Sequence, residues 1–295
     1  MLLNASGCLD ALATPEVARA FDAFVTKTVT PLPREGNDPT RIAETDHGLL
    51  NSIGLQNPGR ERFLAVVLPQ LRGLGLPIWV SVGGFSADEY AETCSRLSDV
   101  TIELNLSCPN VDEAPEAASE IVAACRAETP LPLYAKLSPA LPDIADVARA
   151  AQAAGADGLS LVNTIRGLAL DDETLRPRLA RGAGGYSGPA LKPIALAAVY
   201  VCYRATGLPI VGMGGVSTGR DALELIAAGA SAVAVGTALF TDPGAPHRVR
   251  ADLYKAAAAL GFEDPLAARG IAHAPASQLA LSKRTTNKTP AYTAK

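Results

Sequence analysis

Residues 209–237 read PIVGMGGVSTGRDALELIAAGASAVAVGT. Two short apolar runs, 209–213 and 232–235, flank a segment at 219–228 whose spacing of Ala, Leu and Ile favours a helix, and glycines follow both runs. A strand, a helix and a second strand in this order form a βαβ unit with parallel strands. Because both runs are apolar almost throughout, the unit predicts strands that helices cover on both faces of the sheet.

The same alternation of short strands and helices recurs along the chain. The other six expected strands cover residues 2–5, 23–28, 78–82, 101–105, 133–137 and 158–162. The resulting eight βα units indicate the α/β class, and within it a single closed (β/α)8 TIM barrel rather than an open, doubly wound sheet. We expect the barrel to occupy residues 1–276, and residues 277–295 to form a polar, flexible C-terminal tail.

Composition excludes several classes of protein. The 295 residues carry a net charge of −4, which argues against a nucleic-acid or anionic-membrane partner. No apolar run is long enough to span a bilayer and no export signal is visible at the N-terminus, so we expect a cytoplasmic location. The five cysteines are scattered without a C-x-x-C pair and the three histidines lie far apart, so no disulfide framework and no metal site is expected.

Polar residues or glycines follow every predicted strand. The active sites of (β/α)8 barrels form at the C-terminal ends of the strands, so these placements predict one site at that end. The two longest connections, 29–58 and 163–187, are expected to be functional loops, since their length exceeds that of ordinary connections. The residues at the strand ends include Ser6, Lys27, Thr28, Ser81, Asn105, Lys136, Asn163, Thr164, Gly214, Gly215, Gly236 and Thr237.

The glycines after the last two strands are typical of an anion site. Gly214-Gly215 and Gly236 let the backbone approach a ligand closely, and helix N-termini direct N–H groups toward it. A dinucleotide fingerprint would need a third glycine where Ser217 stands. The pattern therefore predicts a phosphate site, with simple tight turns as the alternative.

Lysines and asparagines at the strand ends indicate the chemistry of the ligand. Lys136 ends an apolar strand, where an unpaired ammonium would be costly, so it needs an anionic ligand such as a reduced flavin or, alternatively, an internal salt bridge. Lys27 is a second candidate for a carboxylate or a flavin. The side-chain amides of Asn51, Asn105, Asn110 and Asn163 offer donors and acceptors that match the edge of a pyrimidine ring, or else serve as turn residues.

Cys108 follows the strand at 101–105 in the stretch Asn105-Leu106-Ser107-Cys108-Pro109-Asn110. A thiol in a loop over the barrel mouth can act as a base once its pKa is lowered, although a lone cysteine is often inert. The remaining cysteines, Cys8, Cys94, Cys125 and Cys202, are interpreted as packing residues.

Five stretches taken together resemble the class 1 dihydroorotate dehydrogenases. They are Phe24–Thr28, Asn51–Leu55, Asn105–Asn110, Ser187–Ala190 and Gly212–Gly215, in the family's order, and the resemblance runs from Ala5 to about Gly261. It implies an FMN-containing (β/α)8 barrel, typically cytosolic and dimeric, that oxidises dihydroorotate to orotate in pyrimidine biosynthesis. A cysteine rather than a serine at position 108 and the absence of a membrane helix separate the chain from the membrane-bound class 2 enzymes.

The resemblance also implies residue roles. Cys108 would remove the C5 proton while a hydride passes from C6 to the flavin N5. The residues implied for orotate are Lys27, Asn51, Gly54, Leu55, Asn105, Asn110, Asn163 and Thr164. Those implied for FMN are Ser6, Lys27, Thr28, Asn105, Lys136, Val162, Gly188, Gly214, Gly215, Gly236 and Thr237.

The electron acceptor stays open at this point. Arg34–Asn37 and Ser81 resemble the single-subunit branch that uses fumarate, whereas Gly54–Gly59 and Asn163–Gly167 resemble the NAD-linked branch. The expected partners are therefore dihydroorotate and orotate, with fumarate or another small acceptor, or an FAD/iron–sulfur electron-transfer subunit if the enzyme is NAD-linked. A homodimer is also expected. The short acidic loop at 111–115 departs from the glycine-rich lid sequence of both branches.

Three other functions compete with this interpretation. A tRNA-dihydrouridine synthase-like barrel would need a basic surface, which the net charge of −4 disfavours. A dihydropyrimidine dehydrogenase-like enzyme would act on uracil or thymine instead of dihydroorotate. A phosphate-binding barrel without flavin would be colourless when pure.

Overall fold

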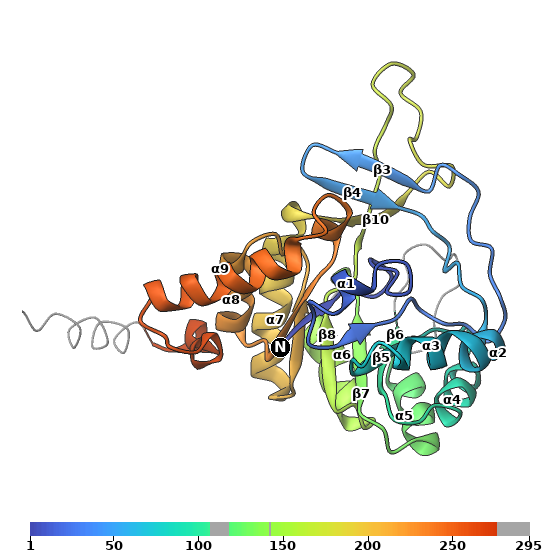
Figure 1. Cartoon of the computed structure of the whole chain (residues 1–295), viewed down its shortest axis with the longest axis horizontal. Helices are drawn as coiled ribbons and strands as arrows, with labels where there is room; N and C mark the ends of the chain where they lie inside the picture. The colour runs from blue at the N-terminus through green and yellow to red at the C-terminus, as the bar shows by residue number, and fades with distance from the viewer. Residues whose placement is uncertain (107–117, 142, 276–295) are drawn as a thin grey trace, which may run out of the picture.

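A computed structural model of the chain describes residues 1–106, 118–141 and 143–275 (Figure 1). Its main sheet has eight strands, in the order β1-β12-β11-β8-β7-β6-β5-β2, and every pairing in it is parallel. A parallel bridge between Leu3 and Ala23 joins the two end strands, so the sheet closes and the predicted (β/α)8 barrel is confirmed. The strands are β1 (Leu2–Asn4), β2 (Phe24–Val25), β5 (Ile78–Val82), β6 (Thr101–Asn105), β7 (Leu133–Leu137), β8 (Gly158–Leu161), β11 (Ile210–Met213) and β12 (Ala232–Val235).

A buried asparagine strengthens the closure between β1 and β2. The side chain of Asn4 donates from Nδ2 to the carbonyl oxygen of Val25 at 2.7 Å and accepts at Oδ1 from the N–H of Val25 at 2.8 Å. Because β2 has only two residues, this amide takes the place of the ladder hydrogen bonds that a longer strand would make.

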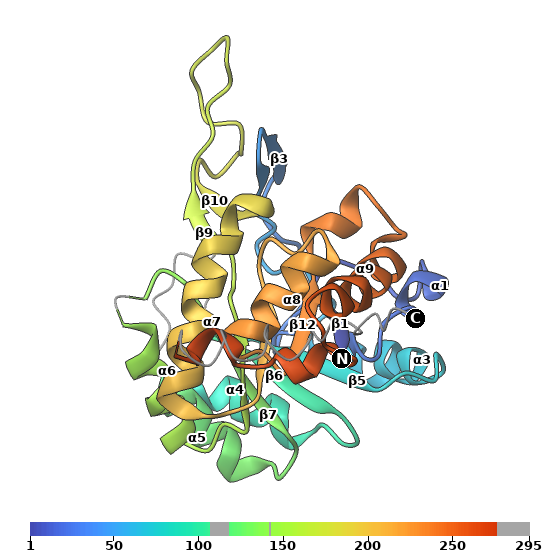
Figure 2. The same cartoon turned by 90° about the vertical axis from the view of Figure 1, so that its left-hand side faces the viewer.

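Helices surround the barrel (Figures 1 and 2). The segment at 60–72 is helical throughout, with a π-helical turn, η1 (Phe63–Val67), between α2 (Arg60–Arg62) and α3 (Leu68–Arg72). The other α-helices are α1 (Pro15–Ala18), α4 (Ala87–Ser95), α5 (Ala118–Glu128), α6 (Ile144–Ala153), α7 (Lys192–Thr206), α8 (Gly219–Ala228) and α9 (Ala245–Ala259). Short 3₁₀ turns are η2 (Pro189–Leu191), η3 (Thr237–Phe240), η4 (Pro265–Ala268) and η5 (Ile271–His273). Within the described residues, no helix combines the length and the apolarity needed to cross a membrane.

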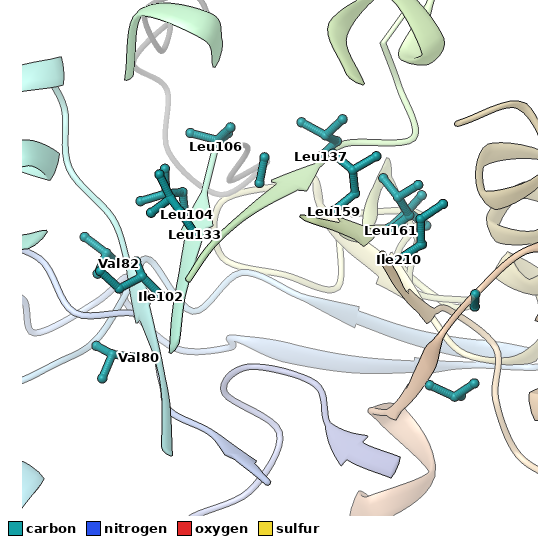
Figure 3. Packing of buried hydrophobic residues seen from close by; sticks show 14 of the residues in the cluster. Val80, Val82, Ile102, Leu104, Leu106, Leu133, Leu137, Leu159, Leu161 and Ile210 are labelled. Carbon is teal, nitrogen blue, oxygen red and sulfur yellow. The ribbon is translucent and has the colours of Figure 1, made fainter. Parts of the chain in front are cut away.

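Alternation along the strands divides the apolar residues between two layers. Ile102, Leu104, Leu133 and Leu137 belong to the large cluster between strands and helices, part of which Figure 3 shows. The opposite faces of the strands carry a smaller cluster inside the barrel, formed by Leu3, Ala23, Val25, Trp79, Val211, Met213, Ala232 and Ala234. This inner cluster occupies much of the barrel interior, and the polar side chains that line the cavity lie near the C-terminal ends of the strands.

A second sheet lies beside the C-terminal ends of the barrel strands. It is antiparallel, in the order β3-β4-β10-β9, and consists of β3 (Ile42–Thr45), β4 (Gly48–Asn51), β10 (Gly184–Ser187) and β9 (Ile165–Gly167). The two connections at 29–58 and 163–187 were expected to be functional loops, and the expectation that they are loops was wrong in part, because they contain these four strands. Each strand pairs with a segment far away in the sequence, as Leu50 does with Tyr186, so local patterns do not reveal it. The chain between β9 and β10 projects away from the barrel (Figure 2).

Candidate active site

A cavity of about 410 Å³ opens at the C-terminal end of the barrel, between the strand ends and the antiparallel sheet. Every barrel strand except β5 contributes residues to its wall directly or through the turn that follows it. Strands β3 and β4 and the turn after β4 supply Ile42, Leu49, Asn51, Ile53, Leu55 and Gln56. The site thus lies where the strand-end argument predicted it, and the long connection at 29–58 forms one wall.

The structure brings most of the expected site residues together. The following line the cavity: Ser6, Lys27, Thr28, Asn51, Leu55, Asn105, Lys136, Val162, Asn163, Thr164, Gly188, Gly214, Gly215, Gly236 and Thr237. Cys108, Asn110 and the loop at 111–115 lie outside the described residues. Lys27 and Thr28 both face the cavity although they are adjacent, which a regular strand would not allow, and the ladder of β2 accordingly ends at Val25 rather than at residue 28 as expected.

Gly54 is not among the residues of the cavity wall. Its φ is +77°, and a Cβ at this position would lie 2.6 Å from Oδ1 of Asn37. Its carbonyl oxygen accepts a hydrogen bond from Nε of Arg34 at 3.2 Å, and the Arg34 guanidinium stacks over the ring of Phe85. Gly54 therefore shapes the turn that places Leu55 against the cavity.

A chain of hydrogen bonds orients the polar side chains at the cavity floor. Asn163 donates to Asn105 at 3.0 Å, and Asn105 donates from Nδ2 to the hydroxyl of Thr28 at 3.1 Å. The Thr28 hydroxyl in turn lies 3.0 Å from Oγ of Ser81, which is how β5 supports a site that it does not line. Because each amide already has a fixed partner, the floor is organised before any ligand binds.

The two lysines at the strand ends lie in different surroundings. Nζ of Lys136 forms a buried salt bridge with Oε1 of Glu103 at 3.2 Å, so the internal salt bridge considered for this lysine is present, and Lys136 lines the cavity as well. Lys27 crosses Gly7 so closely that a Cβ there would lie 2.9 Å from Cδ of the lysine. Among the described wall residues there is no aspartate or glutamate, so the cavity is suited to an anionic ligand.

Glycine turns form the wall at the ends of β11 and β12. Gly214 and Gly215 have φ values of +119° and +74°, and a Cβ at Gly215 would lie 2.6 Å from Cβ of Lys192. Gly188 has φ +109°, and a Cβ there would lie 2.6 Å from Cα of Gly48. Only glycine combines these backbone angles with this lack of space, so the turns bring backbone directly against the cavity.

A side chain already uses part of the backbone that was expected to contribute to the phosphate site. The carboxylate of Asp221 accepts hydrogen bonds from the N–H groups of Ser217 and Thr218, at 3.0 and 2.8 Å, and so occupies the start of α8. Burial would raise the pKa of Asp221, but hydrogen bonds from Lys192 and Thr218 and from the Ser217 N–H outweigh it and hold that pKa below its usual value. The N–H groups of Ser217 and Thr218 are therefore already paired with Asp221, whereas the glycine turns remain available for a phosphate.

Two residues of functional interest were missed by sequence reasoning. Glu103 is an acidic residue in the middle of an otherwise apolar run. Such a residue needs a buried partner, and this could have indicated its pairing with a lysine. Cys8 was interpreted as a packing residue, yet it lines the cavity. Burial raises the pKa of the Cys8 thiol, while the charges of Lys136 and Lys27 lower it, and the net effect is an increase. Cys8 is thus a protonated thiol at neutral pH.

FMN fits the residues that are present. Its phosphate requires close backbone approach and no opposing carboxylate, both of which the glycine turns provide. Its ring gains negative charge on reduction, which Lys136 and Lys27 would stabilise, and its pyrimidine edge matches the amides of Asn105 and Asn163. The same donor set suits a carboxylated pyrimidine beside the flavin.

Comparisons with known proteins agree with this chemistry. The sequence profile of the family described as dihydroorotate dehydrogenase matches residues 1–256. The catalytic subunit of dihydroorotate dehydrogenase B (NAD(+)) from Desulforudis audaxviator is 47% identical over 262 residues, which are 85% of each chain. The subunit of the same name from Listeria welshimeri is 45% identical and covers 82% of this chain and 84% of that one. The crystal structure of DHODH in complex with ferulenol from Eimeria tenella has a TM-score of 0.79 at 26% identity, over 93% of this chain and 85% of that one.

Matches of this identity over most of the chain identify its family. They favour a dihydroorotate dehydrogenase over the dihydropyrimidine dehydrogenase-like and tRNA-dihydrouridine synthase-like alternatives. The chain belongs to the class 1 dihydroorotate dehydrogenases, FMN-dependent (β/α)8 barrels that oxidise dihydroorotate to orotate in pyrimidine biosynthesis.

Proposed function

We propose that the chain is the catalytic subunit of an NAD-linked dihydroorotate dehydrogenase, which passes electrons to a separate electron-transfer subunit. The observation that carries this proposal is a cavity with two lysines, an ordered amide network and no described acidic wall residue, in a chain whose relatives at 43–47% identity carry that name. The stretches Gly54–Gly59 and Asn163–Gly167, which resemble the NAD-linked branch, support the same assignment.

The substrate pocket is proposed to lie over the flavin and to use the following contacts. Lys27 would pair with the substrate carboxylate, and the amides of Asn51, Asn105 and Asn163 would bind the N–H and C=O groups of the pyrimidine. Leu55 would pack against the ring and exclude water from it. Bound FMN supplies the hydride acceptor for this oxidation.

Cys108 is the proposed base for the C5 proton. It follows Asn105 by three residues and precedes α5, so it belongs to the connection that leaves the cavity floor at the end of β6. Asn110 in the same connection is a further proposed substrate contact. A correctly placed base contributes roughly 10²–10⁴-fold to the rate of such a step.

The electron-transfer subunit is proposed because the described part of the chain lacks a second route to NAD. Ser217 replaces the third glycine of a dinucleotide fingerprint, and Asp221 occupies the start of α8. The subunit would carry FAD and an iron–sulfur cluster. Fumarate or another small acceptor is the alternative, since Lys27 and the amides could also hold a dicarboxylate.

The remaining proposals concern the setting of the enzyme. We propose a cytoplasmic homodimer. We also propose that it has no nucleic-acid or membrane partner, because its net charge is negative. The division into a barrel at 1–276 and a flexible tail at 277–295 is also a proposal, and residues 276–295 lie outside the described part of the chain.

The test is a comparison of two electron donors, dihydroorotate and dihydrouracil, on pure protein. The chain should purify yellow, release FMN on denaturation and be bleached by dihydroorotate under anaerobic conditions. Dihydrouracil should leave the flavin oxidised. A colourless protein, or bleaching by dihydrouracil and not by dihydroorotate, would contradict the proposal.

A further inference from the structure

Inside the barrel, beneath the cavity floor, Glu103 of β6 and Lys136 of β7 form an ion pair. Their Nζ–Oε1 distance is 3.2 Å, and their side chains are 1% and 7% exposed, respectively. In the strand register Glu103 lies opposite Tyr134 and Asn105 lies opposite Lys136, so Glu103 is one inward-facing step below the lysine. Lys136 lines the cavity and Glu103 does not.

Among the residues that the structure describes, the pair has few charged neighbours. The titratable groups around Lys136 are Cys8 after β1, Lys27 after β2, Glu103 on β6 and Tyr134 on β7. Cys8 is neutral, since burial raises the pKa of its thiol, and burial followed by the charge of Asp157 raises the pKa of Tyr134. Lys27 is a like charge. Within the described part of the chain, Glu103 is therefore the one anion among these neighbours.

Burial makes this anion important for the lysine. An ammonium that is withdrawn from water and lacks a partner tends to lose its proton, and a carboxylate at hydrogen-bond distance opposes that loss. An ammonium has three donors, and the bond to Glu103 uses one of them. The others remain for a ligand in the cavity.

We propose that Glu103 is a positioning residue, which keeps Lys136 charged and directed at the flavin so that the negative charge of the reduced ring is stabilised across the working pH range. The proposal rests on the proposed function, because it assumes that FMN occupies this cavity. Glu103 acts through Lys136, since the carboxylate itself does not reach the cavity wall.

The test is the substitution Glu103→Gln, which preserves the shape of the side chain and an acceptor oxygen but removes the charge. The midpoint potential of bound FMN should then show an added dependence on pH that the wild type lacks, because the ammonium beside the ring has lost its counter-charge. FMN affinity at high pH should fall about tenfold, the effect of one charge-assisted hydrogen bond.

Four matched variants separate charge from packing. Lys136→Met should lower the potential at every pH without the added pH dependence, and the double variant with Glu103→Gln should change the potential no further. Glu92→Gln removes one of the two carboxylate partners of Arg60, outside the cavity, and should behave like the wild type. Glu103→Asp keeps the charge at a longer reach, so it should show a weaker form of the pH dependence, and it supplies the test if Glu103→Gln does not fold.

The possible results distinguish this inference from the proposed function. If wild-type protein binds no FMN, or if dihydroorotate fails to reduce it, the proposed function is wrong. If the wild type is reduced but Glu103→Gln has wild-type potential and affinity at every pH, only the role of Glu103 is wrong. The same holds if Glu103→Asp and Glu103→Gln change the potential equally.

Discussion

Asn163 donates from Nδ2 to Oδ1 of Asn105 at 3.0 Å, which connects the end of β8 to the end of β6 across the intervening β7. Asn105 in turn donates from its own Nδ2 to the hydroxyl of Thr28. Two amides that the sequence places 58 positions apart thus form one unit of the cavity floor. Loss of either partner should disturb the other, because a buried amide that loses its partner must find a new one.

We expect Asn105→Ala to lower kcat/KM for dihydroorotate by at least about 10²-fold, since it removes a proposed ligand contact and releases Asn163 and Thr28. Asn163→Ala should lower kcat/KM by a similar factor. The double variant should lose less activity than the product of the two single fold-losses in kcat/KM. Steady-state kinetics of the three variants measure this coupling. Fully multiplicative effects would show that the two amides act independently.

Cys108→Ala should slow flavin reduction by dihydroorotate by roughly 10²–10⁴-fold while FMN remains bound. Cys108→Ser should be slow at neutral pH and recover as pH rises, because an alcohol is a poorer base. Stopped-flow bleaching of the flavin measures both rates. Cys202→Ala is the control: burial raises the pKa of this thiol to about 12, so it cannot act as a base near neutral pH, and its removal should leave the rate unchanged. Wild-type rates for Cys108→Ala would exclude the cysteine as the base.

Gly215→Ala should weaken FMN binding and lower the Tm, because the new Cβ would lie 2.6 Å from Cβ of Lys192 at a φ of +74°. The left-handed backbone alone costs about 1–2 kcal/mol, and the clash adds about 1–3 kcal/mol. Gly182→Ala is a matched control, since φ there is +76° and a Cβ would meet nothing within 4 Å. Equal losses of FMN affinity in both variants would contradict a role of the glycine turn in binding.

The capping carboxylate of α8 should give a specific pH dependence of stability. The folded-state pKa of Asp221 is lowered from 3.8, so its stabilising contribution is complete above that value and is lost as pH falls through the lower folded-state pKa. Asp221→Asn should therefore be less stable than the wild type at pH 7, and the difference should shrink in acid. Urea unfolding at several pH values measures this, with the exposed Asp172→Asn as control. A difference that is independent of pH would show that the Asp221 charge is unimportant.

The isolated chain should reduce an artificial dye with dihydroorotate but should form no NADH. The reason is the missing dinucleotide site, with Ser217 in the position of a glycine and Asp221 at the start of α8. Adding an electron-transfer subunit that carries FAD and an iron–sulfur cluster should produce NADH. NADH formation by the chain alone, at a rate comparable to dye reduction, would mean that the chain holds a nucleotide site of its own. Rapid turnover with fumarate would instead favour the single-subunit branch.

The sequence by itself determined the barrel and the position of the site. Five of the strands show why: the expected and observed bounds are the same for β5, β6, β7 and β12, and β11 differs only by one residue at its start. A strand that is buried on both faces is mostly apolar, and this pattern can be recognised in consecutive residues even where single polar residues such as Glu103 and Lys136 interrupt it. The polar residues after each strand also predicted the position of the site, because closure of the barrel brings the C-terminal ends of all strands together.

Only the tertiary structure decided what those polar residues do. The antiparallel sheet over the mouth depends on pairings such as Leu50 with Tyr186, and the partner of Lys136 depends on the register between β6 and β7. The placement of Cys8 in the cavity wall was likewise not predicted from the sequence. Each of these facts is a contact between side chains or strands whose partners are set by how the barrel closes and not by their neighbours in the chain.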